Sequence, residues 1–163
     1  MPVTIDGVNR GIPSGFDTPP DVLRRWAAEG FVGERSLHAL MARAAHDHAA
    51  AELHVIAGGA TAIHRLDALH AAGLRLAAAL RRIGVGAGDV IAMQMPNCAE
   101  NAIIFQAAAA LGCVMLPIVH ILGPAELGFI LNDSGAALFF TPDSWKGIDF
   151  LDRVARIADR PSR

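Results

Sequence analysis

The chain has 163 residues, of which 53% are hydrophobic and 18% are charged, and this composition excludes disorder as a description of the whole chain. Its 14 basic and 16 acidic residues give a formal net charge of -2, so no basic surface is available for a phosphate backbone and we expect no nucleic-acid binding. The length suits a single domain with a sizeable core.

The N-terminal part of the sequence suits helices and a short hairpin. Residues 1–20 are polar and rich in Gly and Pro, so we expect an irregular leader, followed over 21–163 by a partial α/β domain. The leader lacks the basic start and apolar run of a signal peptide, and a cytoplasmic protein is the default expectation. Beyond it, apolar spacing and turn residues predict helices over 21–29 and 36–48, strands over 53–57 and 62–65 with a Gly-Gly turn between them, and a helix over 66–83.

Apolar spacing is most regular in the helix over 66–83. Steps of three and four residues separate its apolar positions and put them on one face of the helix: Leu66, Leu69, Gly73, Leu76, Leu80 and Ile83. We therefore expect this face to pack against the rest of the domain.

Short apolar segments then alternate with further helices. Strands are predicted over 90–95, 114–117 and 136–141, and helices over 97–111, 124–134 and 148–158. Asn97 is expected to cap the first of these helices, with Glu100 reaching back as in a capping box. Because short parallel strands are buried on both faces, this order predicts a three-layer α/β fold. Its sheet is mostly parallel, with right-handed crossovers and helices on both faces.

The segment 102–122 offers an alternative, because it is nearly free of charge and about long enough to span a bilayer. Much of its helical half is alanine, which is barely apolar. Gly112 falls where a helix would end, and Pro117 breaks any continuation. We therefore predict a helix followed by a buried strand, and no membrane span.

The seven histidines do not form a metal-binding motif. His46 and His48 lie two residues apart, which puts them on different faces of a helix, and His64 and His70 are separated by a change from strand to helix. His120 follows a parallel strand, at the edge where open α/β sheets bind ligands. It either lines a pocket or is a partly exposed loop residue. We expect no metal site.

Phosphate-binding motifs are not found in the sequence. The glycines of 84–88 follow a helix and precede a strand, the reverse of the order in a dinucleotide fingerprint, so we expect a connector. Lys146, the only lysine, has no glycine-rich loop before it and is expected on the surface. The helix N-terminus at Asn97 could accept an anion, but we expect Asn97 and Glu100 to fill it.

Candidate nucleophiles lack a suitable context. Ser36, Ser134 and Ser144 do not lie on a strand-to-helix elbow. Cys98 and Cys113 are too few for a disulfide framework or a Cys-rich metal site, and we expect buried free thiols in a reducing compartment. The residues alone therefore assign no catalytic, cofactor-binding or metal-ligating side chain.

Several segments do share their order and spacing with one enzyme family. They are the helix, glycine turn and strand at 76–92, Met95-Pro96-Asn97 with Glu100, the segment 110–117, Glu126-Leu127 with Ile130-Leu131, and 133–136, preceded by 26–31 and 36–37. Together they resemble the front part of the acyl-adenylate-forming enzymes, the AMP-binding or acyl-CoA synthetase family, over about 31–141. The segment 117–121 with Gly123-Pro124 resembles the fatty-acyl or alicyclic-acid CoA ligase branch.

This resemblance implies a parent reaction in which a carboxylic acid, ATP and Mg²⁺ form an acyl-adenylate that is passed to coenzyme A. The family's phosphate loop, acidic metal ligands and lysine lie downstream of the region matched. We therefore expect an N-terminal fragment that ends before the phosphate loop, binds none of the parent's cofactors and is inactive alone. Leu66 and Ala68 replace the family's usual aromatic and acidic pair, and no functional residue of the family carries over to this sequence.

Two other functions remain open. The chain could be a standalone α/β interaction module that docks on a partner protein, or a small Rossmann-like binder of a nucleotide or acyl-CoA. Because the parent sheet continues past this segment, we expect an uncovered sheet face or edge that favours self-association or a protein partner.

Overall fold

The computed structural model describes residues 19–31, 35–57 and 59–158. Most of the expected leader over 1–20 lies outside this range. The helices are α1 (Pro20–Ala28), α2 (Leu37–Asp47), α3 (Leu66–Arg82), α4 (Ala99–Leu111), α5 (Pro124–Asp133) and α6 (Phe150–Ala158). The strands are β1 (Glu52–Ala57), β2 (Ala60–Arg65), β3 (Val90–Met93), β4 (Val114–Pro117), β5 (Leu138–Phe140), β6 (Ser144–Trp145) and β7 (Ile148–Asp149).

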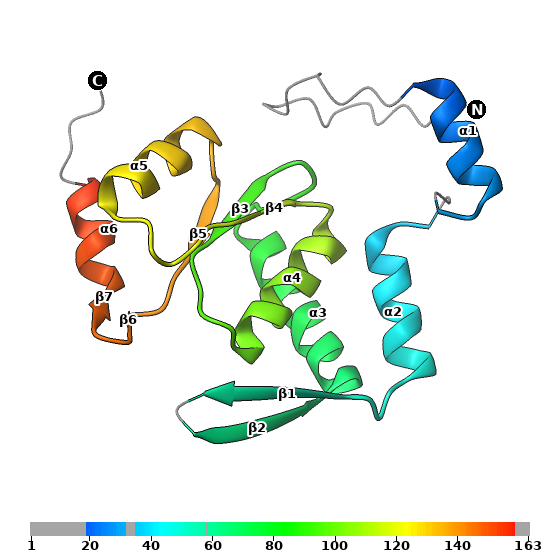
Figure 1. Cartoon of the computed structure of the whole chain (residues 1–163), viewed down its shortest axis with the longest axis horizontal. Helices are drawn as coiled ribbons and strands as arrows, with labels where there is room; N and C mark the ends of the chain where they lie inside the picture. The colour runs from blue at the N-terminus through cyan, green and yellow to red at the C-terminus, as the bar shows by residue number, and fades with distance from the viewer. Residues whose placement is uncertain (1–18, 32–34, 58, 159–163) are drawn as a thin grey trace.

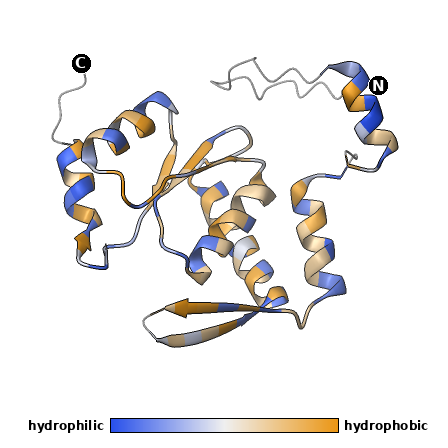
Figure 2. Ribbon diagram, viewed as in Figure 1, coloured by the Kyte–Doolittle hydropathy of each residue, from blue (hydrophilic) through white to orange (hydrophobic). Residues whose placement is uncertain are grey.

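A three-stranded parallel sheet lies at the centre of the molecule, in the order β4-β3-β5 (Figure 1). Met93, the last residue of β3, lies opposite Pro117 of β4 and Phe140 of β5, so the three strands end at one edge. The strands are mostly hydrophobic, as buried parallel strands require (Figure 2). The predicted parallel sheet is confirmed.

Alternate side chains of β3 serve two separate cores. Ile91 and Met93 are buried among residues of α3 and α4 on one face. Ala92 points the other way, into a cluster that contains Leu127 of α5 and Ile157 of α6. Because side chains alternate along a strand, this division produces the predicted layers of helix, sheet and helix.

The α3–α4 pair is held unusually close at one point. A Cβ atom placed on Gly73 of α3 would lie 2.6 Å from Cβ of Gln106 and 3.3 Å from the backbone oxygen of Ile103, both in α4. Only glycine therefore allows the two helices to approach to this distance. Gly73 belongs to the apolar face that the sequence predicts for this helix.

The hairpin β1–β2 is antiparallel, as predicted, and α2 packs on α3 and α4. The Ser36 hydroxyl caps α2 by accepting a hydrogen bond from the Ala39 N–H at 3.2 Å. By contrast α1 has no buried residue and stands apart from the sheet (Figure 1). No helix in the described part of the chain combines the length and the apolar character needed to cross a bilayer. The segment 102–122 instead contains most of α4, then β4.

Several predicted boundaries are wrong. The helix expected from Asn97 begins at Ala99, and its N-cap is Cys98, which makes no side-chain capping bond. Because an N-cap must directly precede the first helical residue, Asn97 lies too far back to cap this helix. The strands β3 and β5 are also shorter than the apolar runs 90–95 and 136–141, because pairing between them stops at Met93 and Phe140.

The helix expected from 148 begins at Phe150, because 144–149 forms a small hairpin, β6–β7. Its two turn residues, Lys146 and Gly147, have φ angles of 47° and 75°. A two-residue hairpin turn needs such positive φ angles, and lysine gives no signal for one.

Candidate functional site

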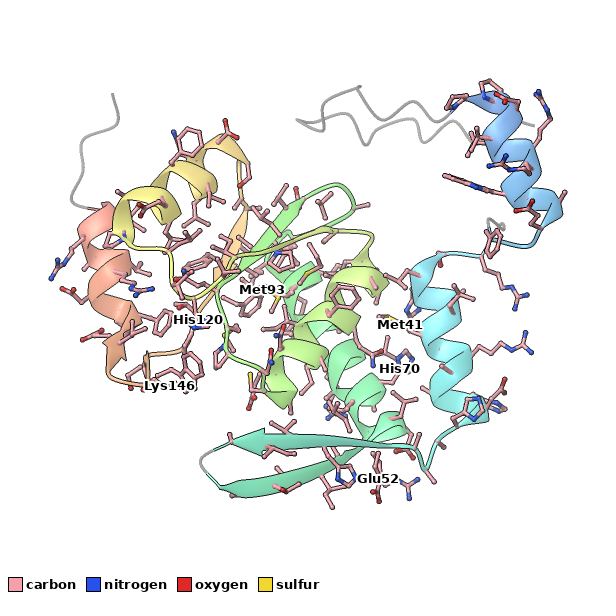
Figure 3. All side chains as sticks on the ribbon, in the orientation of Figure 1. Met41, Glu52, His70, Met93, His120 and Lys146 are labelled. Atoms are coloured by element: carbon pink, nitrogen blue, oxygen red, sulfur yellow. The ribbon has the colours of Figure 1, made fainter. Side chains whose placement is uncertain are left out.

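A hollow of about 350 Å³ opens where β3 and β4 end. It is lined by Met93, Met95, Asn97, Asn101, Phe105, Pro117, Ile118, Val119 and His120. Figure 3 shows Met93 at the end of β3 and His120 in the loop after β4. Because open α/β sheets bind ligands outside the carboxyl ends of their strands, this hollow is the candidate functional site.

The loop over 118–123 forms one wall of the hollow and is anchored through its backbone. The Gln94 side-chain amide, directly after β3, donates to the carbonyls of Val119 at 3.0 Å and Leu122 at 3.2 Å. From α6, Arg153 Nη1 donates to the carbonyls of His120 at 2.7 Å and Leu122 at 2.9 Å. Two side chains from distant elements thus fix the position of this wall.

Gln94 is 0% exposed, and its Oε1 atom has no hydrogen-bond partner among the described residues. The hydroxyl oxygen of Thr141, which follows β5, is likewise buried without a partner in the described part of the chain. Gln94 directly follows Met93 and Thr141 directly follows Phe140, and Met93 and Phe140 are paired between β3 and β5. The carboxyl edge of the sheet therefore holds buried polar atoms that its own hydrogen bonds do not satisfy.

His120 is a half-buried loop residue that also lines the hollow, so both alternatives for this residue hold. Its ring meets the ring of Trp145 in β6 edge-on, with centroids 4.7 Å apart and planes at 84°. This contact joins the hollow to the β6–β7 hairpin, which the sequence does not predict.

The hollow has few polar groups, and most of them are amides. Its polar groups are the side-chain amides of Asn97 and Asn101 and the ring of His120, set among apolar side chains such as Phe105. Amides donate and accept hydrogen bonds but do not exchange protons near neutral pH. Within the described ranges, no three His, Cys, Asp or Glu side chains lie close enough to hold a metal ion.

The two cysteines are free and half-buried. Burial is the main cause that raises the pKa of the Cys98 thiol, and burial followed by the negative charge of Asp89 raises the pKa of the Cys113 thiol. The Cys113 thiol donates to the carbonyl of Gly86 at 3.1 Å. Both thiols are therefore protonated and poorly nucleophilic at neutral pH.

The glycines of 84–88 form the predicted connector between α3 and β3. The N–H of Gly86 donates to the Asp89 carboxylate at 2.8 Å, so a side chain already occupies a donor that a phosphate would need. Lys146 is exposed in the β6–β7 turn, and its Nζ lies 4.6 Å from the centre of the Trp145 ring. The predicted surface lysine is confirmed.

The three serines occupy structural positions. Ser36 caps α2, the Ser134 hydroxyl donates to the carbonyl of Leu131 at 3.3 Å, and the backbone N–H of Ser144 donates to Asp143 at 2.6 Å. Gln94, Arg153, Asn101 and Phe105 were not singled out by sequence reasoning. Of these only Gln94 carried a signal, as a polar residue inside the apolar run 90–95.

The histidines lie apart from one another, except that the ring centroids of His38 and His70 are 5.9 Å apart. His46 contacts Asp47 at the end of α2, with its Nδ1 3.0 Å from the carboxylate, whereas His64 lies in β2. His70 in α3 donates from Nδ1 to Oε1 of Gln106 in α4 at 2.7 Å. A second hollow, of about 550 Å³, lies beside this pair and is lined by residues of α2, β1 and α4 that include Met41, Cys98 and Gln106.

Comparison with known proteins gives one consistent family. The family model described as AMP-binding enzyme matches residues 20–162. The long-chain-fatty-acid–CoA ligase FadD13 of Mycobacterium tuberculosis is 41% identical over 89 residues, which are 53% of this chain and 17% of that protein. The medium-chain fatty-acid–CoA ligase of Escherichia coli is 34% identical over 71 residues, 44% of this chain and 12% of that protein.

Solved structures agree on the fold. The inhibitor-bound N-terminal domain of FACL13 from Mycobacterium tuberculosis superposes with a TM-score of 0.67 at 24% identity, covering 78% of this chain and 31% of that one. MbtA of Mycobacterium smegmatis, without ligand, gives a TM-score of 0.72 at 22% identity, covering 86% and 25%. The chain thus corresponds to a minor share of each relative, and its fold matches part of the N-terminal domain of FACL13 and part of MbtA.

Proposed function

Because the chain belongs to the AMP-binding enzyme family, we propose that it provides the N-terminal α/β scaffold of an ATP-dependent acyl-CoA synthetase. The parent reaction converts a carboxylic acid, ATP and CoA into acyl-CoA, AMP and pyrophosphate. The family match over 20–162 is the observation that carries this proposal, and the named relatives support a fatty-acyl substrate.

The described residues do not fit a Mg²⁺–triphosphate group. Transfer of an adenylyl group needs preorganised cationic donors and metal ligands around the phosphates. Here the side chain of Lys146 lies over Trp145, and the Gly86 N–H is bound by Asp89. We therefore derive no step through ATP on these residues, and we propose that the 163-residue chain alone does not form acyl-adenylate.

The hollow between Met93 and His120 gives this scaffold a binding role. It combines apolar walls with the amides of Asn97 and Asn101, a lining suited to an organic ligand with a few polar atoms. In the parent reaction we assign it to small-molecule binding.

The interaction-module alternative rests on exposed apolar side chains. Ile121, in the loop after β4, is 73% exposed, and Phe129 of α5 is 69% exposed. In the described part of the chain, β4 and β5 each pair on one side only. Such edges favour self-association or a partner that supplies further α/β structure. A cytoplasmic location, the default for the family chemistry, belongs to the same proposal.

ATP–pyrophosphate exchange with a panel of fatty acids tests the main proposal. The purified chain alone should show no exchange above background. A chimera in which 20–162 replaces the matching segment of FadD13 should show acid-dependent exchange, while FadD13 with that segment deleted should not. Exchange by the chain alone would refute its inactivity, and an inactive but folded chimera would refute the scaffold role.

A further inference from the structure

The two outer strands of the parallel sheet present different edges. Among the described residues, β4 and β5 each pair with β3 alone. The pairing of β4 ends at Pro117, and a proline cannot donate the hydrogen bond that a further strand would need. The sequence of β5 over 138–140 is Leu-Phe-Phe, without proline or charge. Because sheets protect their exposed edges with such residues, the edge of β5 is the one suited to being covered.

The side chains of β5 are only half-buried, although they pack into both cores. Leu138 and Phe140 contact the cluster on the α3–α4 face, and Phe139 contacts the cluster on the opposite face. By contrast Ile91 and Ala92 of the central strand β3 are 0% exposed. A strand on the open side of β5 would bury more of these three side chains.

The connections within the sheet show a consistent handedness. α4 covers one face of the sheet and connects β3 to β4. α5 covers the other face and carries the chain from β4 past β3 to β5. Two right-handed crossovers on opposite faces run in opposite directions along a sheet, as these two do.

α6 extends this pattern beyond β5. Ile157 of α6 packs into the same core as α5. The N–H of Phe150, the first residue of α6, donates to the carbonyl of Asp143 at 3.0 Å, so α6 begins near the carboxyl end of β5. Figure 1 shows α6 on the β5 side of the sheet. A right-handed crossover through α6 therefore leads to a strand that lies beyond β5 and parallel to it.

Thr141 provides an independent observation at the same edge. It directly follows β5, and its buried hydroxyl oxygen has no hydrogen-bond partner in the described part of the chain. Leaving such a group unpaired is costly. A neighbouring strand lies about 4.8 Å away and presents N–H and C=O groups along its length, so it can supply a partner.

We propose that the open edge of β5 docks a parallel, apolar strand from a second polypeptide. This inference rests on the scaffold role proposed above. The partner that fits is the remainder of an acyl-CoA synthetase, because this chain covers only 31% of the FACL13 domain and 25% of MbtA. Pairing with β5 of a second copy would be antiparallel in the closed two-fold dimers that proteins usually form, and the crossover rule calls for a parallel strand.

Co-expression tests the docking edge. The 163-residue chain is produced together with tagged FadD13 that lacks the segment matched by this chain. We expect an equimolar complex on the tag. Hydrogen exchange at 136–141 should be roughly tenfold slower in the complex than in the free chain, while exchange in β1 stays unchanged. The absence of a complex, or unchanged exchange at 136–141, would overturn the proposal. The covalent chimera described above needs no docking between chains, so an active chimera without a complex would leave the scaffold role standing.

Variants locate the partner on β5. Ala137 is exposed directly before β5, and Ala137→Lys should weaken the complex by roughly tenfold because the charge must be desolvated at the edge. Ala60→Lys is the matched control, since Ala60 is exposed at the start of β2, and it should leave the complex unchanged. Thr141→Val removes the unpaired hydroxyl, so the free chain should stay at least as stable while the complex weakens by roughly fivefold. Unchanged binding by both the Ala137 and Thr141 variants would overturn the assignment.

Discussion

The close approach of α3 and α4 at Gly73 makes a quantitative prediction. An alanine there would place its Cβ 2.6 Å from Cβ of Gln106, an atom fixed to the α4 backbone, so no side-chain rotation relieves the overlap. Overpacking of this kind costs up to about 3 kcal/mol. Alanine gains about 1 kcal/mol over glycine in helix propensity. The difference predicts that Gly73→Ala destabilises the chain by about 2 kcal/mol.

Gly86→Ala provides the matched control. A Cβ on Gly86 would meet no atom within 4 Å, and its φ is not in the left-handed region. The same substitution should therefore be neutral or stabilise by about 0.4–1 kcal/mol through the unfolded state. Urea and thermal unfolding followed by circular dichroism measure both variants. For a chain of this size Gly73→Ala should lower Tm by roughly 4–8 °C. A Gly73→Ala variant as stable as the unchanged chain would show that the helices do not pack at this distance.

Three further predictions concern the loop anchor, the thiols and the β6–β7 turn. Gln94→Ala removes two hydrogen bonds to loop carbonyls from a fully buried position. It should lower the free energy of unfolding, measured in urea, by about 2–4 kcal/mol, and a decrease below about 0.5 kcal/mol would contradict the anchoring role. Because burial raises the pKa of Cys98 and Cys113, the folded state favours the protonated thiols. The free energy that the protonated thiols contribute to folding is complete below the ordinary thiol pKa and is lost as pH rises through the raised pKa. A disulfide reagent should therefore modify both thiols far more slowly in the folded chain than in denaturant at pH 8. Equal rates would refute this. Lys146→Asn should stabilise the turn by about 0.5–1 kcal/mol, since asparagine tolerates a φ of 47° better than lysine, and a loss of stability would argue against that backbone.

The layered fold could be predicted from the sequence because its signals are local. The three- and four-residue spacing from Leu66 to Ile83 and the alternation of short apolar segments with helices after Val90 both predict elements that the structure contains. Placing helices on both faces followed from the burial that parallel strands require. The β1–β2 hairpin was predicted by its glycine turn between two short apolar segments.

The boundaries of helices and strands and the long-range contacts could not be predicted from local sequence patterns. Asn97 and Glu100 have the residue types of a capping box, yet the helix starts two residues later, where Cys98 adopts an extended conformation. The anchoring of the 118–123 loop joins Gln94 and Arg153, which are 59 positions apart, and no spacing rule relates them. For the same reason sequence reasoning compared His70 with His64, although its structural partner is His38.

All four bonds from Gln94 and Arg153 end on main-chain oxygens, at Val119, His120 and Leu122. Every amino acid offers the same carbonyl group, so exchanging these three side chains leaves the attachments intact. Descendants of this chain can therefore change the side chains on this wall of the hollow while the backbone of the wall keeps its position. Selection for a new ligand would act on Val119 and His120, whereas Gln94 and Arg153 should resist change.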